Sequence, residues 1–212
     1  MLITFEGIEG CGKSTQARLL YDWLQEMGNS VLITREPGST FLGEKLRSIL
    51  LNQDSGDISA LSELFLYLAD RSEHVKKVVQ PALEQNKIVI IDRYVDSTLV
   101  YQGFGRGFDL SFLQQLNSLA SSGFWPTITL LLDLSPQEGL KRAEKRNLQK
   151  GIQTEEGRFE SEEWYFHQNI RKGYLELAKQ ASERICVLDA SDSVESVFAN
   201  IKEYVQDKLA MG

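Results

Sequence analysis

An eight-residue segment near the start of the sequence fits the phosphate-binding pattern GxxxxGK[ST] at all four fixed positions; it reads Gly7, Ile8, Glu9, Gly10, Cys11, Gly12, Lys13 and Ser14. Glycines let such a loop curl tightly, so that successive backbone N–H groups point inward at phosphate oxygens. Lys13 would bring a positive charge to the β- and γ-phosphates, and the Ser14 hydroxyl could ligate Mg²⁺. The segment therefore predicts a binding site for nucleotide phosphates.

The residues around this loop predict the strand, loop and helix arrangement in which the pattern is functional. The segment 2–5 alternates and is rich in residues that favour β structure. After the loop, Ala17, Leu20 and Leu24 recur at helical spacing until Gly28, a common stop signal. The local context therefore supports the phosphate-binding interpretation.

The composition is that of an ordinary globular domain: 212 residues, 42% hydrophobic and 25% charged. A formal net charge of −7 argues against nonspecific nucleic-acid binding, which requires a broad basic face. No apolar run approaches the ~20 residues of a membrane span, and no signal-peptide pattern opens the sequence. The two cysteines form neither a disulfide framework nor a metal motif, so we expect a cytoplasmic protein.

Apolar segments that favour β structure alternate with helical segments along the whole sequence. Continuous apolar runs, such as 88–91 and 130–132, are typical of buried parallel strands. We therefore predict an α/β fold of the P-loop NTPase type, a single domain over 1–212 with a five-stranded parallel sheet and helices on both faces. The expected strands are 2–6, 31–35, 88–92, 128–133 and 185–189, and the expected helices are 14–28, 41–52, 59–86, 109–121, 136–146, 160–182 and 193–209.

Charged residues lie at the carboxyl ends of the predicted strands, where ligands bind in open α/β sheets. Asp92 ends one strand and could hold Mg²⁺ beside the phosphate loop, and Arg93 could grip a phosphate bidentately. Asp133 ends another strand and competes for the metal role, although its position suggests that it helps to start the next helix. Arg35 precedes Pro37-Gly38, so it either points into the same crevice or is a surface charge.

Other polar residues have both a functional and a structural interpretation. Tyr67 and Arg71 share one helix face and could stack on and hydrogen-bond to a base, although an ordinary helix pair has the same spacing. The polar segment 147–157 is either a solvated surface loop or a lid over phosphates. His74 and His167 have no catalytic or metal-ligating context, and we expect them to be structural or surface residues.

Missing motifs narrow the choice among nucleotide-binding proteins. Neither the DxxG turn nor the NKxD element of switch GTPases occurs in the sequence. ATPase motors and transporter subunits usually place a catalytic glutamate after the Walker B aspartate, whereas Arg93 follows Asp92 here. These features favour a small-molecule kinase.

Taken in order along nearly the whole sequence, the motifs resemble those of the thymidylate kinase (dTMP kinase) family, whose members are nucleoside monophosphate kinases with a lid. The combination of Asp92-Arg93-Tyr94 with Tyr101-Gln102-Gly103 is specific to that family among nucleoside monophosphate kinases. The other matching features are the phosphate loop, Arg35-Glu36-Pro37-Gly38, Tyr67 with Asp70-Arg71, Gly105-Arg106-Gly107, Gly139-Leu140-Lys141-Arg142-Ala143, Arg158-Phe159-Glu160 and Gly173-Tyr174-Leu175-Glu176-Leu177.

The resemblance implies an activity and a set of substrate contacts. The enzyme would transfer the γ-phosphoryl group of ATP to dTMP, giving dTDP and ADP for dTTP synthesis, and would work as a cytoplasmic homodimer. Residues 7–14, Thr15 and Arg142 would bind ATP, and Ser14 and Asp92 would hold Mg²⁺. The residues implied to bind dTMP are Arg35 and Arg93 at its phosphate, Glu9 and Tyr101 at its sugar, Tyr67 and Arg71 at its base, and Pro37, Ser97, Thr98 and Gln102 around them.

The resemblance also implies which residues are catalytic. The acceptor is a phosphate oxygen that is already largely ionised near neutral pH, so no general base is required. Lys13, Arg93 and a lid arginine would supply positive charge to the transferred group. Arg146 occupies the matching place in a lid expected at about 142–160, and Arg142 and Arg158 are the alternatives.

Two other functions stay open at the level of sequence. A kinase for another nucleotide or nucleoside would share the same phosphate loop, and a screen of acceptors would distinguish it. A non-catalytic ATP-binding regulator would bind ATP but release no ADP with any acceptor.

Overall fold

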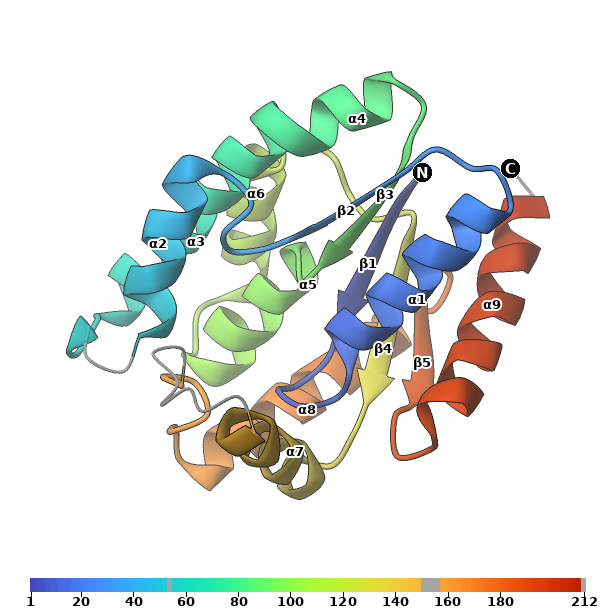
Figure 1. Ribbon diagram of the computed structural model, residues 1–212. Helices are drawn as coiled ribbons and strands as arrows, with labels where there is room; N and C mark the ends of the chain where they lie inside the picture. The colour runs from blue at the N-terminus through green and yellow to red at the C-terminus, as the bar shows by residue number, and fades with distance from the viewer. Residues whose placement is uncertain (53–54, 150–156, 211–212) are drawn as a thin grey trace.

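The computed structural model describes residues 1–52, 55–149 and 157–210, the side chains of 146–149 excepted, and has an α/β architecture (Figure 1). Within these ranges, five strands form one sheet in the order β2-β3-β1-β4-β5, and every neighbouring pair is parallel. The fold class predicted from the sequence is confirmed. The strands span Leu2–Glu6 (β1), Val31–Arg35 (β2), Ile88–Asp92 (β3), Ile128–Asp133 (β4) and Ile185–Asp189 (β5), as expected.

The register of the sheet brings the candidate site residues to one edge. Phe5 of β1 pairs with Asp92 of β3 and with Leu130 of β4. Asp92 in turn pairs with Arg35 of β2. The carboxyl ends of three strands therefore lie level with the loop that follows β1, which is the loop predicted to bind phosphates.

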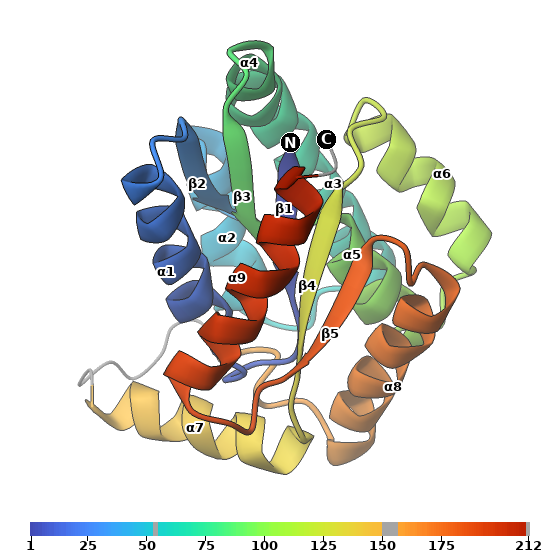
Figure 2. The same ribbon diagram turned by 90° about the vertical axis from the view of Figure 1, so that its right-hand side faces the viewer.

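Helices cover both faces of the sheet. Figure 2 shows α1 and α9 on one side and α5 and α8 on the other. Leu20 and Leu24 of α1 pack with Ile3 and Phe5 of β1 in the main core, while Leu2 faces a second cluster. The helices span Lys13–Glu26 (α1), Phe41–Leu51 (α2), Ala60–His74 (α3), Gln80–Glu84 (α4), Val95–Thr98 (α5), Leu110–Ala120 (α6), Pro136–Gln149 (α7), Trp164–Gln180 (α8) and Val194–Ala210 (α9), with π-helical turns at Val75–Val79 (η2) and Leu99–Gly105 (η3).

Two helical regions differ from the expectation. The single helix expected over 59–86 is an unbroken succession of α3, η2 and α4. The helical segment Val95–Gly105, which comprises α5 and η3, was not predicted. Most of its residues are buried, and the buried set includes the polar residues Asp96, Thr98 and Gln102. Polar and apolar residues therefore do not divide between a solvent face and a core face, which is the pattern that marks a surface helix. No helix in the described part of the chain is long and apolar enough to cross a membrane.

Candidate active site

A cavity of about 810 Å³ opens at the carboxyl edge of the sheet. It lies against the phosphate loop, the ends of β2 and β3, α3, η3 and α7. Most of the residues expected to bind substrates or metal line it: Glu9, Gly10, Gly12, Lys13, Ser14, Thr15, Arg35, Pro37, Tyr67, Arg71, Asp92, Arg93, Ser97, Thr98, Tyr101, Gln102 and Arg142. The structure thus brings both predicted substrate sets to one cavity.

The loop 7–14 has the backbone that its glycines were expected to allow. Gly10 and Gly12 have φ angles of 72° and 96°, in the left-handed region that favours glycine. A Cβ at Gly10 would also collide with the backbone of Gly139 in α7. The ammonium of Lys13 lies within the loop and donates to the carbonyl oxygens of Gly7 (3.1 Å) and Ile8 (2.8 Å). Gly7, Ile8 and Cys11 are buried and do not line the cavity. Their contribution is therefore to the conformation of the loop.

Ser14 and Asp92 form a pair of oxygen ligands beside this loop. The Ser14 hydroxyl donates to Oδ2 of Asp92 at 2.5 Å, although the two residues come from α1 and β3. Hydroxyl and carboxylate oxygens are hard ligands of the kind that Mg²⁺ prefers, usually completed by water and substrate phosphates. These two side chains therefore fit a magnesium ion held jointly with ATP.

Asp133, the competing candidate, has another partner. Its two carboxylate oxygens accept from Nε and Nη2 of Arg171 in α8, at 2.7 and 2.8 Å. The start of α7 is instead capped by Ser135, whose hydroxyl accepts from the backbone N–H of Glu138. The idea that Asp133 helps to start this helix is therefore wrong, and its role is to tie α8 to the sheet.

Arg93 lines the cavity and has an uncommon backbone conformation. Its φ is 66°, a region that non-glycine residues occupy rarely and mainly where surrounding contacts enforce it. The guanidinium donates to Ser97 (3.3 Å), Tyr174 (3.2 Å) and Glu9 (3.0 Å). Burial alone would lower the pKa of Arg93, but Tyr101, Tyr174 and the carboxylates outweigh it and raise that pKa well above its usual value. A permanent positive charge is thus fixed next to the phosphate loop.

Glu9 and Tyr101 are hydrogen-bonded to each other, and both contact Arg93. The Tyr101 hydroxyl donates to Oε1 of Glu9 at 2.5 Å, and the Arg93 guanidinium lies 5.0 Å from the Tyr101 ring centroid. Burial would raise the pKa of Glu9, but the charges of Arg93 and Lys13 outweigh it and lower that pKa. Glu9 is therefore an anion that orients the two side chains.

Behind Arg93 lies a buried carboxyl group that the sequence did not single out. Glu6 accepts from the Tyr94 backbone N–H (2.8 Å), the Ser97 hydroxyl (2.6 Å) and the Tyr174 hydroxyl (2.8 Å). Burial, together with the nearby Asp96 carboxylate, raises the pKa of Glu6 to about 7. Its position at the carboxyl end of β1 was the signal that could have identified it.

Comparisons with known proteins decide the family. A family model described as thymidylate kinase matches residues 5–201. The thymidylate kinase of Maridesulfovibrio salexigens is 52% identical over 99% of this chain and 96% of its own length, and that of Oleidesulfovibrio alaskensis is 52% identical over 100% of both. A crystal structure of thymidylate kinase from Ehrlichia chaffeensis has a TM-score of 0.77 at 36% identity, covering 97% of this chain and 98% of that one.

The chain belongs to the thymidylate kinase family. The expected activity is thereby confirmed: the enzyme is a nucleoside monophosphate kinase that phosphorylates dTMP with ATP as the donor. The relatives reported above give no support to another acceptor or to a non-catalytic regulator.

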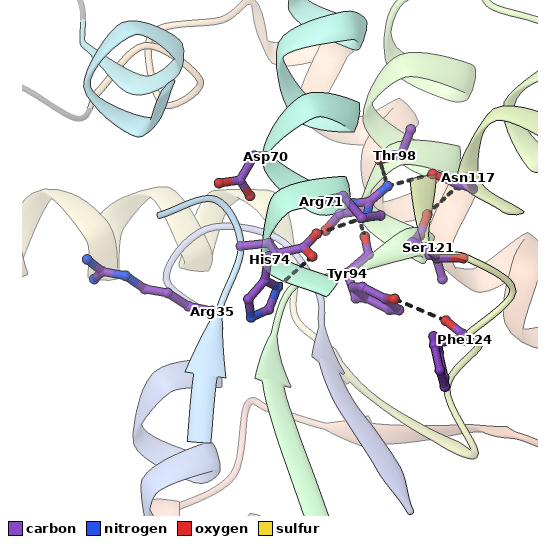
Figure 3. A network of polar contacts seen from close by, with 12 residues as sticks. Arg35, Asp70, Arg71, His74, Tyr94, Thr98, Asn117, Ser121 and Phe124 are labelled. Atoms are coloured by element: carbon purple, nitrogen blue, oxygen red, sulfur yellow. Dashed lines mark hydrogen bonds and ion pairs between the residues drawn. The ribbon is translucent and has the colours of Figure 1, made fainter. Parts of the chain in front are cut away.

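The two residues expected at the base of dTMP, Tyr67 and Arg71, differ in exposure. Tyr67 is half-buried on α3, with its ring centroid 6.5 Å from that of Phe159. Arg71, one turn later, is buried and is held by a network of polar contacts (Figure 3). Nε donates to Glu36 (2.9 Å), Nη1 to Thr98 (2.8 Å) and Asn117 (2.5 Å), and Nη2 to the Tyr94 carbonyl (3.0 Å). Four of the five guanidinium N–H groups thus have protein acceptors.

The arginines considered for the lid role lie in different surroundings. Arg142 lines the cavity and donates to Glu138 and to the Ala190 carbonyl. Arg158 donates to the Leu50 carbonyl and to the buried Glu63, both at 2.6 Å, and therefore anchors its segment to α2 and α3. The side chain of Arg146, in α7, lies outside the described residues, as do residues 150–156 of the expected lid.

Several residues of the cavity wall were not expected there. They include Phe159, whose ring packs edge-on against Tyr101 at 5.3 Å, and Glu36, which binds both Arg71 and His74. Phe159 and Glu36 do belong to matching motifs, but motif membership alone did not indicate a place in the cavity. Among the described residues, the additional set is Glu36, Arg47, Leu51, Tyr94, Phe159 and Glu160.

Proposed function

We propose that the kinase transfers the γ-phosphoryl group directly from ATP to dTMP, with both nucleotides bound at once in this cavity. One observation carries the proposal: the phosphate loop with Lys13, and Arg35 and Arg93, border the same cavity of about 810 Å³. Phosphoryl transfer requires two polyanions in line, with positive charge around the transferred group. A single basic cavity with a phosphate loop at one end meets that requirement.

On the acceptor side, the phosphate of dTMP binds to Arg35 and Arg93. Tyr67 stacks on thymine, and the remaining Arg71 N–H group points to the edge of the base. Glu9 contacts the 3′-hydroxyl, and Tyr101 occupies the space that a 2′-hydroxyl would need. Pro37, Ser97, Thr98 and Gln102 complete the pocket, in which all ten residues named here line the cavity.

On the donor side, the loop 7–14, Thr15 and Arg142 bind ATP, and Gly7, Ile8 and Cys11 contribute through the shape of the loop because they do not line the cavity. Mg²⁺, held by Ser14 and Asp92 with the phosphates, neutralises charge that develops on the transferred group. Lys13 and Arg93 place fixed positive charges at the same point, and we assign the third to Arg146. No residue has to remove a proton, because the attacking phosphate oxygen is already largely ionised near neutral pH.

Arg35→Ala tests the acceptor assignment cleanly, since Arg35 is exposed at the rim of the cavity. The loss of a charged contact to phosphate should raise KM for dTMP by about 10- to 100-fold. KM for ATP should change little. Arg18→Ala is the control, because Arg18 is an exposed arginine of α1 that pairs with Asp22. Equal effects on both substrates, or none, would place the acceptor phosphate elsewhere.

The assembly and the extent of the domain are also proposals. We infer one domain over 1–212, with a lid at about 142–160 that closes over the phosphates, and a homodimer. Large apolar side chains are exposed on three neighbouring helices, namely Phe41 and Ile49 on α2, Leu61 and Phe65 on α3, and Phe112 and Leu119 on α6. A mass twice that of the chain in sedimentation would support the dimer. We place the enzyme in the cytoplasm, since both cysteines are free thiols.

A further inference from the structure

His74 is a fully buried histidine that none of the proposed substrate contacts uses. It ends α3, one helical turn after Arg71. Its Nδ1 lies 2.8 Å from Oε1 of Glu36, and its Nε2 lies 2.9 Å from the Thr34 hydroxyl oxygen. Figure 3 shows its ring within the network of polar contacts that surrounds Arg71.

The Glu36 carboxylate divides its two oxygens between the histidine and the arginine. Oε2 accepts from Nε of Arg71 at 2.9 Å, while Oε1 faces Nδ1 of His74. A carboxylate accepts only, so Nδ1 of His74 must carry the hydrogen. A buried charged pair is stable only when its remaining lone pairs also find partners. Without His74, Oε1 would lose its partner, and the carboxylate could turn away from Arg71.

The other contacts of Arg71 do not fix its orientation in the same way. Thr98 and Asn117 accept from Nη1, and the Tyr94 carbonyl accepts from Nη2. These are neutral acceptors on α5, α6 and the turn after β3. Glu36 is the charged acceptor among the four acceptors of Arg71, so its bond to Nε adds the Coulomb attraction between two ions to the hydrogen bond. Glu36 is therefore the strongest single contact that orients the guanidinium.

We propose that His74 is a positioning residue for nucleobase recognition: it holds the Glu36 carboxylate, which orients the Arg71 guanidinium towards the base of the acceptor. The inference rests on the proposed role of Arg71. His74 would then affect the affinity of the enzyme for dTMP and its selectivity for the base. It would have little effect on ATP binding or on the rate of phosphoryl transfer.

Nuclear magnetic resonance of the imidazole groups tests the inference on the unmodified enzyme. The chain has two histidines, and His167 serves as an internal control because it is buried in α8 and does not line the cavity. We expect dTMP to shift the ¹⁵N signals of His74, with ATP alone leaving them in place and His167 unaffected by either. Signals of His74 that do not respond to saturating dTMP, or that move no more than those of His167, would overturn the proposal.

Two substitutions separate the two contacts of the ring. His74→Asn keeps a donor near the place of Nδ1, facing Glu36, whereas His74→Gln keeps a polar group near Nε2, facing Thr34. We expect His74→Gln to raise KM for dTMP about tenfold, the effect of one hydrogen bond to a charged group. It should narrow the preference for dTMP over dCMP, with kcat and KM for ATP within about twofold. His74→Asn should restore most of the loss, and equal effects of both substitutions would contradict the proposal.

Arg71→Lys, measured in parallel, distinguishes a failure of the positioning role of His74 from a failure of the proposed base-binding role of Arg71. A raised KM for dTMP in Arg71→Lys, combined with a wild-type KM in His74→Gln, would overturn the positioning role and leave the proposed function intact. An unchanged KM in Arg71→Lys would overturn the proposed role of Arg71, and the inference about His74 with it. His167→Gln is the matched control and should retain wild-type kinetics.

Discussion

Replacing Lys13 by alanine removes the charge that the phosphate loop carries toward the transferred phosphoryl group. The ammonium is held by two carbonyl oxygens of the loop, those of Gly7 at 3.1 Å and Ile8 at 2.8 Å. It therefore needs no substrate to bring it into position, and its contribution is electrostatic preorganisation. The substitution should leave the fold intact, because none of the core contacts of α1 depends on the lysine charge.

The size of the effect follows from Coulomb's law. A unit charge about 4 Å from the transferred group, at an effective dielectric constant of about 20, contributes about 4 kcal/mol. At 1.36 kcal/mol for each factor of ten, that is a loss of about a thousandfold in kcat. Removal of single preorganised donors from other active sites costs about 10²–10³, which agrees with this magnitude.

Steady-state ADP release at saturating ATP and dTMP measures this effect, and thermal unfolding establishes that the variant is folded. Arg18→Ala is the matched control, since it removes a positive charge from the same helix, where Arg18 is exposed and paired with Asp22. It should retain wild-type kcat. A folded Lys13→Ala enzyme that keeps more than about a tenth of wild-type kcat, an effect below about 1.4 kcal/mol, would refute the proposed role of the lysine.

Three further perturbations probe the sugar pocket, the lid and the buried carboxyl group. Tyr101→Ala should narrow the ratio of kcat/KM for dTMP over its ribonucleotide about tenfold or more, and an unchanged ratio would remove Tyr101 from the sugar pocket. Arg146→Ala should lower kcat about 10³-fold, whereas Arg158→Ala should mainly lower Tm because its partner is Glu63; the opposite pattern would exchange their roles. The pKa of Glu6 is raised to about 7 in the folded enzyme, so this carboxyl favours the folded state below pH 4.5 and loses that contribution as pH rises through 7. Glutamine does not titrate, so the free energy of unfolding of Glu6→Gln minus that of wild type should increase from pH 5 to pH 8. A difference that stays constant over this range would show that Glu6 does not titrate there.

The strands and the phosphate loop were predictable because their signals are local. Ile88–Ile91 in β3 is a continuous apolar run, since a central parallel strand is buried on both faces. The loop 7–14 is defined by residues adjacent in sequence. The place of Asp92 and Arg35 at the carboxyl ends of their strands was also predictable, because ligands bind there in open parallel sheets. The pairing of Asp92 with Arg35 and with Phe5 comes from the structure.

The rest of the site depends on contacts between distant segments, which single-sequence patterns do not encode. His74 has no catalytic motif around it, yet it faces Glu36, 38 residues earlier. Arg158 donates a hydrogen bond to Glu63, 95 residues earlier, so its role in anchoring the segment could not be predicted from its place in the expected lid. The His74–Glu36 and Arg158–Glu63 contacts form because α3 packs against the end of β2 and against the segment after α7.

A coupled assay of ADP release with wild-type enzyme, ATP, Mg²⁺ and a panel of acceptors tests the central claim most directly. The panel is dTMP, dUMP, UMP, CMP, AMP and thymidine. We expect the highest kcat/KM with dTMP and no turnover with thymidine, because thymidine has no phosphate for Arg35 and Arg93 and its hydroxyl would require a general base. Failure of dTMP to stimulate ADP release, or turnover of thymidine as fast as that of dTMP, would contradict the account.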